Sequence, residues 1–222
     1  MEDHTLLVNA IKNPKTKEEG FKALVKEFHQ PLYWHIRKIV LDHEDADDVL
    51  QNTYVKIFKN IKKFRGESKL FSWMYRIATN ESLSFIKEKS KKMGYSINEY
   101  NEHQINQLHA DAYFEGDEIA IKLQQSIAKL PQKQRLIFNL KYYEELKYEE
   151  ISEILETSVG SLKASYHHAV KKIQNELGFV AKHTIHDAVI DLCEAFDQNL
   201  LPNSLEDELY FNIKRMNNLE LS

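Results

Sequence analysis

Basic and aromatic side chains interleave over residues 59–92, and this combination can bind nucleic acid. The segment holds ten Lys or Arg residues against three Glu. Lys and Arg bind phosphates, and aromatic rings stack on exposed bases or wedge a strand apart. The aromatic residues include Phe58, just before the segment, and Phe64, Phe71, Trp73 and Tyr75. A core helix with a solvated basic face has the same composition, so both interpretations stay open.

A second candidate for DNA binding is a helix-turn-helix. The pattern predicts a short helix over residues 148–155, a turn over 156–158 and a longer helix over 159–175. The inward positions of the longer helix are Val159, Leu162, Tyr166, Ala169 and Ile173. The outward positions are Gly160, Ser161, Lys163, Ala164, His167 and Lys171. Small and polar side chains there permit close approach to base edges in a major groove, although a helical hairpin that binds no DNA has a similar pattern.

The spacing of apolar residues predicts an all-α chain. Glycine and proline are scarce, with 6 and 4 residues. Residues 18–41 are amphipathic, and Pro31 is expected to kink this helix or to start a new one. A helix over 46–62 follows an acidic run, and Ser68 is expected to cap a third helix over 69–92.

Charge and periodicity divide the rest of the chain. We expect two small helical domains, residues 1–92 and 117–178. Residues 93–116 lack helical periodicity and carry acids but no Lys or Arg, which predicts a flexible acidic linker. Residues 179–222 form an acidic extension with a helix expected over 184–197. The net charge of −4 does not exclude a nucleic-acid partner. Salt screening limits the range of each electrostatic interaction to about 8 Å, so the basic segments can bind phosphates locally.

The sequence argues against several classes of protein. No apolar run approaches the roughly 18 residues of a membrane helix, and residues 1–4 lack the basic start of a signal peptide. One cysteine, Cys193, allows neither an internal disulfide nor a cysteine-based metal cage. No phosphate loop, paired zinc histidines or nucleophile motif is present. We expect a soluble, cytoplasmic protein with no membrane insertion, no catalytic residues, no metal and no cofactor.

Four ordered motifs identify a family resemblance. They are Asp45-Ala46-Asp47-Asp48-Val49-Leu50-Gln51-Asn52-Thr53-Tyr54, Phe64-Arg65-Gly66-Glu67-Ser68, Trp73-Met74-Tyr75-Arg76-Ile77-Ala78-Thr79-Asn80, and Leu130-Pro131-Gln132-Lys133-Gln134-Arg135. The first three closely resemble region 2 of the sigma-70 family, in its extracytoplasmic-function (ECF) group. The fourth, with the helix-turn-helix, resembles region 4. The resemblance covers residues 18–177 and implies a promoter-recognition subunit of RNA polymerase.

The resemblance implies a partner for each part of region 2. The helix at residues 45–58 would bind the clamp helices of the largest subunit of core RNA polymerase. The residues implied in this contact are Asp45, Asp48, Val49, Gln51 and Tyr54. The loop at residues 64–69 would capture a flipped base of the minus-ten promoter element, and the next helix would lie beside that element. The residues implied in minus-ten binding are Phe64, Arg65, Ser68, Lys69, Trp73, Arg76, Thr79 and Asn80.

Region 4 would contact the polymerase flap and the minus-thirty-five promoter element. The residues implied in this DNA contact are Ser158, Gly160, Ser161, Lys163, Ala164, His167 and Lys171. The chain departs from the family at Ser165, His168 and Val170, where arginine is common. Fewer phosphate contacts predict a weaker salt dependence for region 4. The resemblance also makes an anti-sigma factor a plausible partner.

Two other functions remain open alternatives. A stand-alone helix-turn-helix regulator would need a dimer interface and a palindromic site, and it would give residues 69–92 no purpose. A sigma-like helical interaction or regulatory protein would bind polymerase or another partner without starting transcription. The acidic extension is interpreted as a solubilising or packing element. The alternative hypothesis is that it covers the basic DNA-facing surface until polymerase displaces it.

Overall fold

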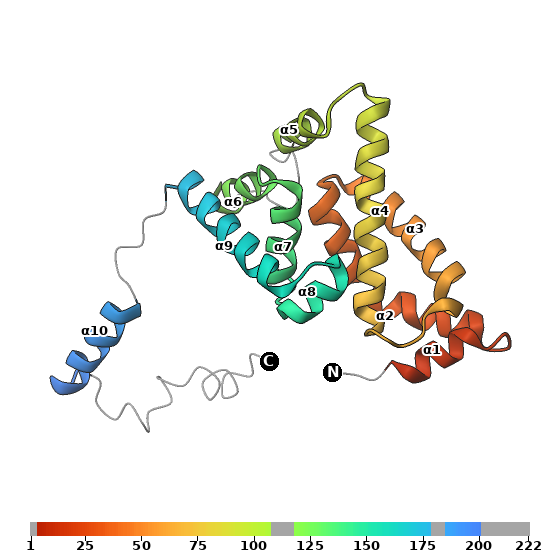
Figure 1. The fold of residues 1–222 in the computed structure, drawn as a ribbon, viewed down its shortest axis with the longest axis horizontal. Helices are drawn as coiled ribbons and strands as arrows, with labels where there is room; N and C mark the ends of the chain where they lie inside the picture. The colour runs from red at the N-terminus through yellow and green to blue at the C-terminus, as the bar shows by residue number, and fades with distance from the viewer. Residues whose placement is uncertain (1–3, 108–117, 179–184, 201–222) are drawn as a thin grey trace. The chain divides into compact units, whose positions relative to one another are not determined.

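The computed structural model describes residues 4–107, 118–178 and 185–200, and helices are the regular structure in all three stretches. The predicted all-α fold class is confirmed. The chain divides into two compact units, residues 1–178 and 179–222. The first unit contains the helices α1 to α9, and the second contains α10 (Figure 1).

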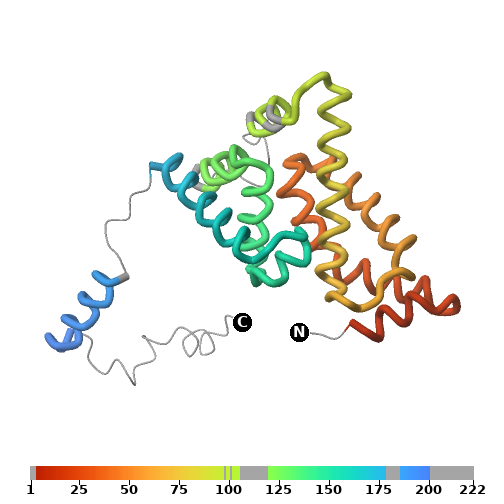
Figure 2. Tube along the Cα trace, in the orientation of Figure 1, coloured from red at the N-terminus to blue at the C-terminus, as the bar shows by residue number. Residues whose placement is uncertain are grey.

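The first four helices surround one apolar core. They are α1 (Thr5–Lys12), α2 (Lys17–Val40), α3 (His43–Asn60) and α4 (Leu70–Lys92). Helices α2, α3 and α4 pack against one another, and α1 packs on α2 (Figure 2). The contact between α1 and α2 depends on Gly20, because a Cβ there would lie 2.9 Å from the Ile11 backbone nitrogen. A side chain at position 20 would therefore push α1 away.

Helix α2 runs through Pro31 rather than restarting there. Proline lacks the N–H that would bond to the carbonyl four residues earlier. Pro31 lies on the exposed side of α2, so water can bind the freed carbonyl. The buried side of the same helix keeps its apolar residues in register, and packing against α3 and α4 stabilises the uninterrupted helix.

The helix ends around α3 and α4 follow two different patterns. Asp42 caps α3 as its acidic start suggests, and its carboxylate accepts a hydrogen bond from the Asp45 N–H at 2.9 Å. The prediction that Ser68 caps the next helix is wrong. Lys69 occupies the N-cap position of α4, and its side chain makes no capping bond. Gly66, at φ 78°, turns the chain between the two helices.

The predicted linker contains a helix, α5 (Ile97–Gln107). Tyr100 of α5 is buried, and its hydroxyl donates to an Asp45 carboxylate oxygen at 3.1 Å. Gln104 in turn donates to the Tyr100 hydroxyl at 3.0 Å. This chain of hydrogen bonds attaches α5 to the start of α3. The rest of the predicted linker, residues 108–116, lies outside the described residues.

The helix-turn-helix forms as predicted. Helices α6 (Glu118–Ala128) and α7 (Gln132–Tyr142) precede it, and α8 (Tyr148–Leu155) and α9 (Val159–Glu176) are its two members. Glu156 turns the chain in a left-handed conformation, at φ 50°. Ser158 caps α9 by accepting a hydrogen bond from the Ser161 N–H at 3.5 Å. Phe138 of α7 stacks on Tyr142 and on Tyr166 of α9, which holds the two helices together.

Helices α7 and α8 also pack against the first four helices. Buried residues of α7 and α8 belong to the same apolar cluster as those of α2 and α4. They are Leu136, Ile137, Leu140, Ile151 and Ile154. Helix α8 lies against α4, and α7 lies against α2 (Figure 1). The helix-turn-helix is therefore part of one packed unit with the N-terminal helices.

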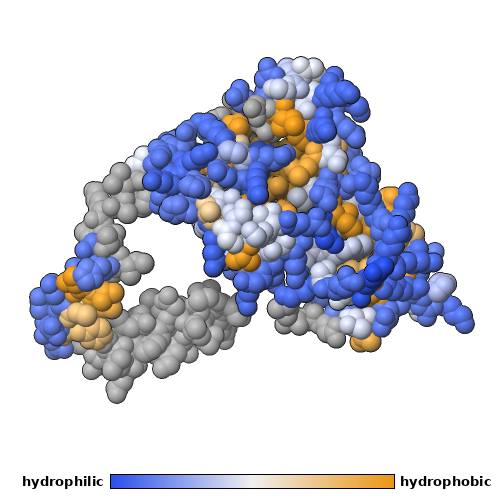
Figure 3. Space-filling view, in the orientation of Figure 1, coloured by the Kyte–Doolittle hydropathy of each residue, from blue (hydrophilic) through white to orange (hydrophobic). Residues whose placement is uncertain are grey.

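The second unit contains one amphipathic helix, α10 (Ile185–Asp197), close to the predicted span. Val189, Leu192 and Phe196 are exposed on it, and Figure 3 shows this apolar patch in orange. The residues after Leu200 lie outside the described residues. Across the described stretches of the chain, no helix has both the length and the apolar character needed to span a membrane.

Candidate nucleic-acid interface

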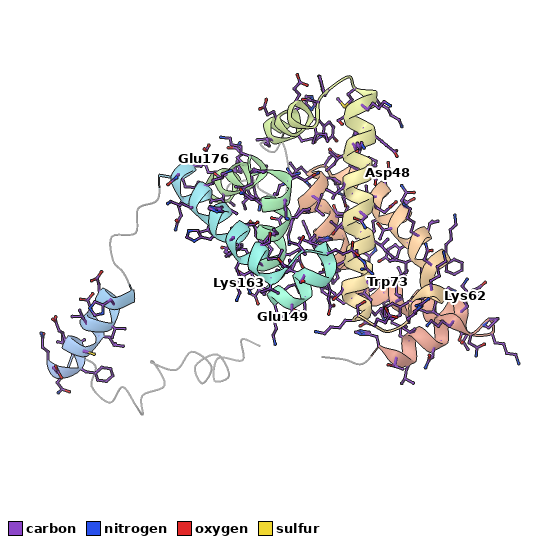
Figure 4. The ribbon with its side chains drawn as sticks, in the orientation of Figure 1. Asp48, Lys62, Trp73, Glu149, Lys163 and Glu176 are labelled. Carbon is purple, nitrogen blue, oxygen red and sulfur yellow. The ribbon has the colours of Figure 1, made fainter. Side chains whose placement is uncertain are left out.

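Helix α4 and the loop before it carry several of the predicted minus-ten residues with side chains that are at least partly exposed. Arg65, Lys69 and Asn80 are exposed, and Ser68, Trp73 and Arg76 are partly exposed. Trp73 packs on Phe64 with ring centroids 5.3 Å apart. Trp73 lies near the N-terminal end of α4 in Figure 4. Five polar or cationic groups and one indole ring thus share this part of the molecule.

Phe64 does not share this exposure. Its side chain is 8% exposed and belongs to the apolar core. The Lys12 ammonium donates a 2.6 Å hydrogen bond to the Phe64 carbonyl, which ties the loop to α1. The Phe64 ring therefore packs against Trp73 from the core side and supports the loop. It could receive a base only if the loop left this position.

Thr79 also lies inside the protein. It is 3% exposed, and its hydroxyl is 2.8 Å from Nε2 of the buried His35. Burial, followed by the charge of Lys38, lowers the pKa of His35 to about 3, so the imidazole is neutral. His35 also packs on the Tyr75 ring with centroids 4.5 Å apart. Thr79 thus joins α4 to α2 and does not face the surface with Arg76 and Asn80.

Two of the surface cations are paired with carboxylates of the helix-turn-helix. The Lys69 ammonium lies 2.6 Å from Glu150, and the Arg76 guanidinium lies 3.0 Å from Glu156. Burial raises the pKa of Glu150, but hydrogen bonds from Lys69 and the Lys147 N–H outweigh it and leave the pKa lowered. Glu150 is therefore a carboxylate at neutral pH. These two ion pairs therefore bring the helix-turn-helix into contact with the candidate minus-ten surface of α4.

The predicted polymerase-binding residues of α3 divide into exposed and buried ones. Asp48 and Gln51 are exposed, and Figure 4 shows Asp48 on the helix. Asp45 and Val49 are buried, and Asp45 forms an ion pair with Lys89 of α4. Tyr54 is partly buried and packs edge-on against Phe21. Burial raises the pKa of Tyr54 to about 12. The structure thus leaves Asp48 and Gln51 open to a partner and gives Asp45 and Val49 internal contacts.

All seven predicted minus-thirty-five residues are exposed, at the cap and along the outer face of α9. They are Ser158, Gly160, Ser161, Lys163, Ala164, His167 and Lys171. The Lys163 ammonium lies 5.7 Å from the centre of the Tyr148 ring, and Lys163 is labelled in Figure 4. The packed positions Leu162, Ala169 and Ile173 lie on the opposite side. Helix α9 therefore presents small and polar groups to one side, as major-groove recognition requires.

Sequence reasoning missed the residues that connect the two candidate interfaces. Lys38 of α2 forms a 2.7 Å ion pair with Glu144, and both side chains are largely buried. The Tyr75 hydroxyl donates to the other Glu144 oxygen at 3.4 Å. Burial, followed by the Glu144 charge, raises the pKa of Tyr75 above its usual range. No spacing signal marks Lys38 and Glu144, because they lie 106 residues apart.

Comparisons with known proteins agree with this arrangement. The family model "Sigma-70 region 2" matches residues 24–92, and "Sigma-70, region 4" matches residues 120–173. The first covers α3, α4 and most of α2, and the second covers most of α6 to α9. Together the two models match more than half of the chain, in the order that the motifs predict.

Curated relatives match over nearly their whole length. The ECF RNA polymerase sigma factor SigW of Bacillus subtilis is 28% identical over 171 residues, which cover 73% of this chain and 91% of the relative. The RNA polymerase sigma-H factor of Pseudomonas aeruginosa is 26% identical over 168 residues, which cover 72% and 87%. The ECF RNA polymerase sigma-E factor of Escherichia coli is 25% identical over 178 residues, which cover 73% and 89%.

Solved structures share the fold. CnrH, in complex with the cytosolic domain of CnrY, gives a TM-score of 0.57 at 16% identity, covering 79% of this chain and 97% of that chain. The sigma factor RpoE of Bartonella quintana, in complex with the anti-sigma factor NepR, gives a TM-score of 0.57 at 18% identity. That match covers 72% of this chain and 98% of RpoE.

Proposed function

The chain belongs to the sigma-70 family, in its ECF group, and we propose a specific role for each of its exposed surfaces in transcription initiation. As a sigma factor, it directs RNA polymerase to start transcription. One observation supports the assignment of roles best. A region 2 half with an exposed cationic and aromatic edge is followed in the same chain by a region 4 half with an exposed helix-turn-helix.

We assign each proposed role to residues whose side chains are exposed or partly exposed. Asp48 and Gln51 of α3 bind the clamp helices of the largest polymerase subunit, and region 4 contacts the flap. Lys69, Trp73, Arg76 and Asn80 bind the minus-ten element, and the outer face of α9 binds the minus-thirty-five element. The protein works in the cytoplasm and has no catalytic activity of its own.

A regulatory partner follows from the fold and the family. The structure of RpoE of Bartonella quintana is a complex with the anti-sigma factor NepR. We therefore expect an anti-sigma factor for this chain as well. Its binding would be measured by competition with core polymerase for the purified protein. An alternative is that the chain binds polymerase as a regulator without starting transcription, which the acidic α10 favours.

Run-off transcription tests the proposed function. Purified bacterial core polymerase is incubated with fragments of the source genome, with and without the protein. Specific transcripts that require the protein are the expected result. Binding to core without any transcript would instead support the regulatory alternative. Failure to bind core at all would contradict the proposed function.

Arg76→Ala should reduce the specific transcript about tenfold, as expected for loss of one good nucleic-acid contact. The matched control is Lys87→Ala, which removes an exposed cation from the same helix outside the predicted set. Transcript yield per unit of core-bound protein is the measurement. An equal loss in both variants would show that general positive charge on α4 matters and that Arg76 has no specific contact.

Lys171→Ala should lower the salt dependence of binding to minus-thirty-five DNA. Each phosphate contact contributes a slope of about 0.9 in log K against log salt, so the variant should lose about that much. Lys171 is exposed, and α9 has few other cations. Fluorescence anisotropy at several salt concentrations measures the slope. Lys133→Ala, which removes an exposed cation of α7 outside the predicted set, is the control and should leave the slope unchanged.

A further inference from the structure

Three carboxylates from the helix-turn-helix half bind three cations of the region 2 half. Glu144 precedes α8, Glu150 lies in α8 and Glu156 follows it. Their partners are Lys38, Lys69 and Arg76, at 2.7, 2.6 and 3.0 Å respectively. Each pair joins residues at least 80 positions apart in the chain. The acidic edge of α8 therefore lies along the cationic edge of α2 and α4.

Two of these cations belong to the minus-ten surface. Lys69 and Arg76 are seven residues apart, which places them on the same side of α4 about two turns apart. Glu150 and Glu156 lie at the beginning and just after the end of α8. A carboxylate offers a cation two anionic oxygens, as a phosphate does. The two carboxylates thus bind the same cationic groups that the phosphates of promoter DNA would bind.

Polar and apolar contacts surround these ion pairs. The Asn139 amide of α7 donates to the Lys38 carbonyl at 3.3 Å, and the Lys38 ammonium lies 4.7 Å from the centre of the Tyr143 ring. Ile151 and Ile154 of α8 are buried in the cluster that also contains residues of α4. Figure 4 shows Glu149 of α8 and Trp73 of α4 on the neighbouring helices. The acidic edge is thus held in place by packing and does not depend on charge alone.

We propose that α8 and its flanking turns act as an internal mimic of promoter DNA, which holds the free protein in a closed form with its minus-ten surface occupied. This inference rests on the proposed function, because it assigns Lys69 and Arg76 to DNA binding. Promoter DNA and α8 compete for the same two cations. The minus-ten surface becomes available when region 4 moves away from α4, and affinity for DNA falls in proportion to the closed fraction.

The distance between the two halves tests the closed form without any promoter. Spin labels are attached at Lys62→Cys and Gln174→Cys, both exposed positions, in the full chain with Cys193→Ser. Double electron–electron resonance on the free protein should give a single, narrow distance distribution, because Lys62 and the end of α9 lie at opposite ends of one packed unit (Figure 4). Glu150→Gln with Glu156→Gln should raise the ratio of open to closed molecules about fivefold, the expected effect of losing two partly exposed ion pairs.

The matched control keeps the charge change and moves it along the same helix. Glu149→Gln with Glu153→Gln removes two exposed carboxylates of α8 that form none of the three cross-half pairs. This control should keep the wild-type distribution. Binding of a random-sequence, 20-nucleotide single-stranded DNA, measured by anisotropy, should increase about fivefold in the Glu150/Glu156 variant and not in the control.

The outcomes separate the closed form from the sigma-factor function. A broad distribution for the wild-type protein, or equal distributions for the test and control variants, would overturn the internal mimic even if run-off transcription succeeds. A closed wild-type form that opens in the test variant but not in the control supports the mimic, whatever the transcription result. Adding core polymerase to the labelled wild-type protein should change the distance distribution, and an unchanged distribution in the bound complex would count against displacement of α8.

Discussion

Asp45→Asn should lower the free energy of unfolding by about 2 kcal/mol, although the sequence motif places Asp45 among polymerase-binding residues. Asp45 is 5% exposed. Its two carboxylate oxygens accept from the Lys89 ammonium and from the Tyr100 hydroxyl. An asparagine offers one acceptor oxygen and no charge, so one of these donors loses its partner. Urea unfolding followed by circular dichroism measures the change.

Asp48→Asn is the control, and it separates structure from binding. Asp48 is exposed on the same helix three residues later, so its substitution should change stability by less than about 0.5 kcal/mol. Affinity for core polymerase, measured by titration with a labelled protein, should fall in Asp48→Asn. If Asp45→Asn were fully stable and lost polymerase binding, Asp45 would be a contact residue and not an internal anchor.

Periodicity and family motifs predicted the helices well because both depend on local sequence. The 3.6-residue pattern gave α3, α4, α8 and α9 to within three residues at each end. Of the two expectations at Pro31, the start of a new helix is wrong, because packing of the buried side of α2 outweighs one missing hydrogen bond. The prediction of a bare linker missed α5, whose polar sequence becomes helical around a single buried tyrosine, Tyr100.

Family motifs predict which residues matter but not which way they face. The Asp45–Tyr54 and Trp73–Asn80 motifs mix exposed residues with core residues, because a helix turns each successive side chain by about 100°. Thr79 and Phe64 were predicted as DNA contacts, and the structure places both in the core. The contacts of Glu144, Glu150 and Glu156 could not be predicted, since each partner lies at least 80 residues away and no local pattern connects them.

His35 is another residue whose burial could not be predicted from the sequence. It also makes the stability of the protein sensitive to acid. Nothing in its sequence context distinguishes it from the exposed His29 of the same helix, yet it is 1% exposed. It lies between the Thr79 hydroxyl and the Tyr75 ring, where α2 meets α4. A charged imidazole there would be separated from water and close to the Lys38 ammonium. The fold therefore requires the neutral form.

Lowering the pH from 7.5 to 5.0 should cost the protein about 2 kcal/mol of stability through His35. Burial lowers the pKa of His35 from 6.5 to about 3. Between these values the unfolded chain binds a proton that the folded chain does not, so acid favours unfolding. This contribution is complete above pH 6.5 and is lost as the pH falls toward 3. Urea unfolding at a series of pH values measures the slope.

His35→Gln should flatten this pH dependence, because glutamine does not titrate and its amide can still form a hydrogen bond with Thr79. The variant should be less stable than the wild type at pH 7.5, since the amide cannot reproduce ring packing on Tyr75. His29→Gln removes an exposed imidazole from the same helix and should keep the wild-type slope. An unchanged slope in His35→Gln would show that other groups cause the acid sensitivity. Since His35 packs on Tyr75, whose hydroxyl donates to Glu144, protonation of His35 should also loosen the contact between α4 and the helix-turn-helix half.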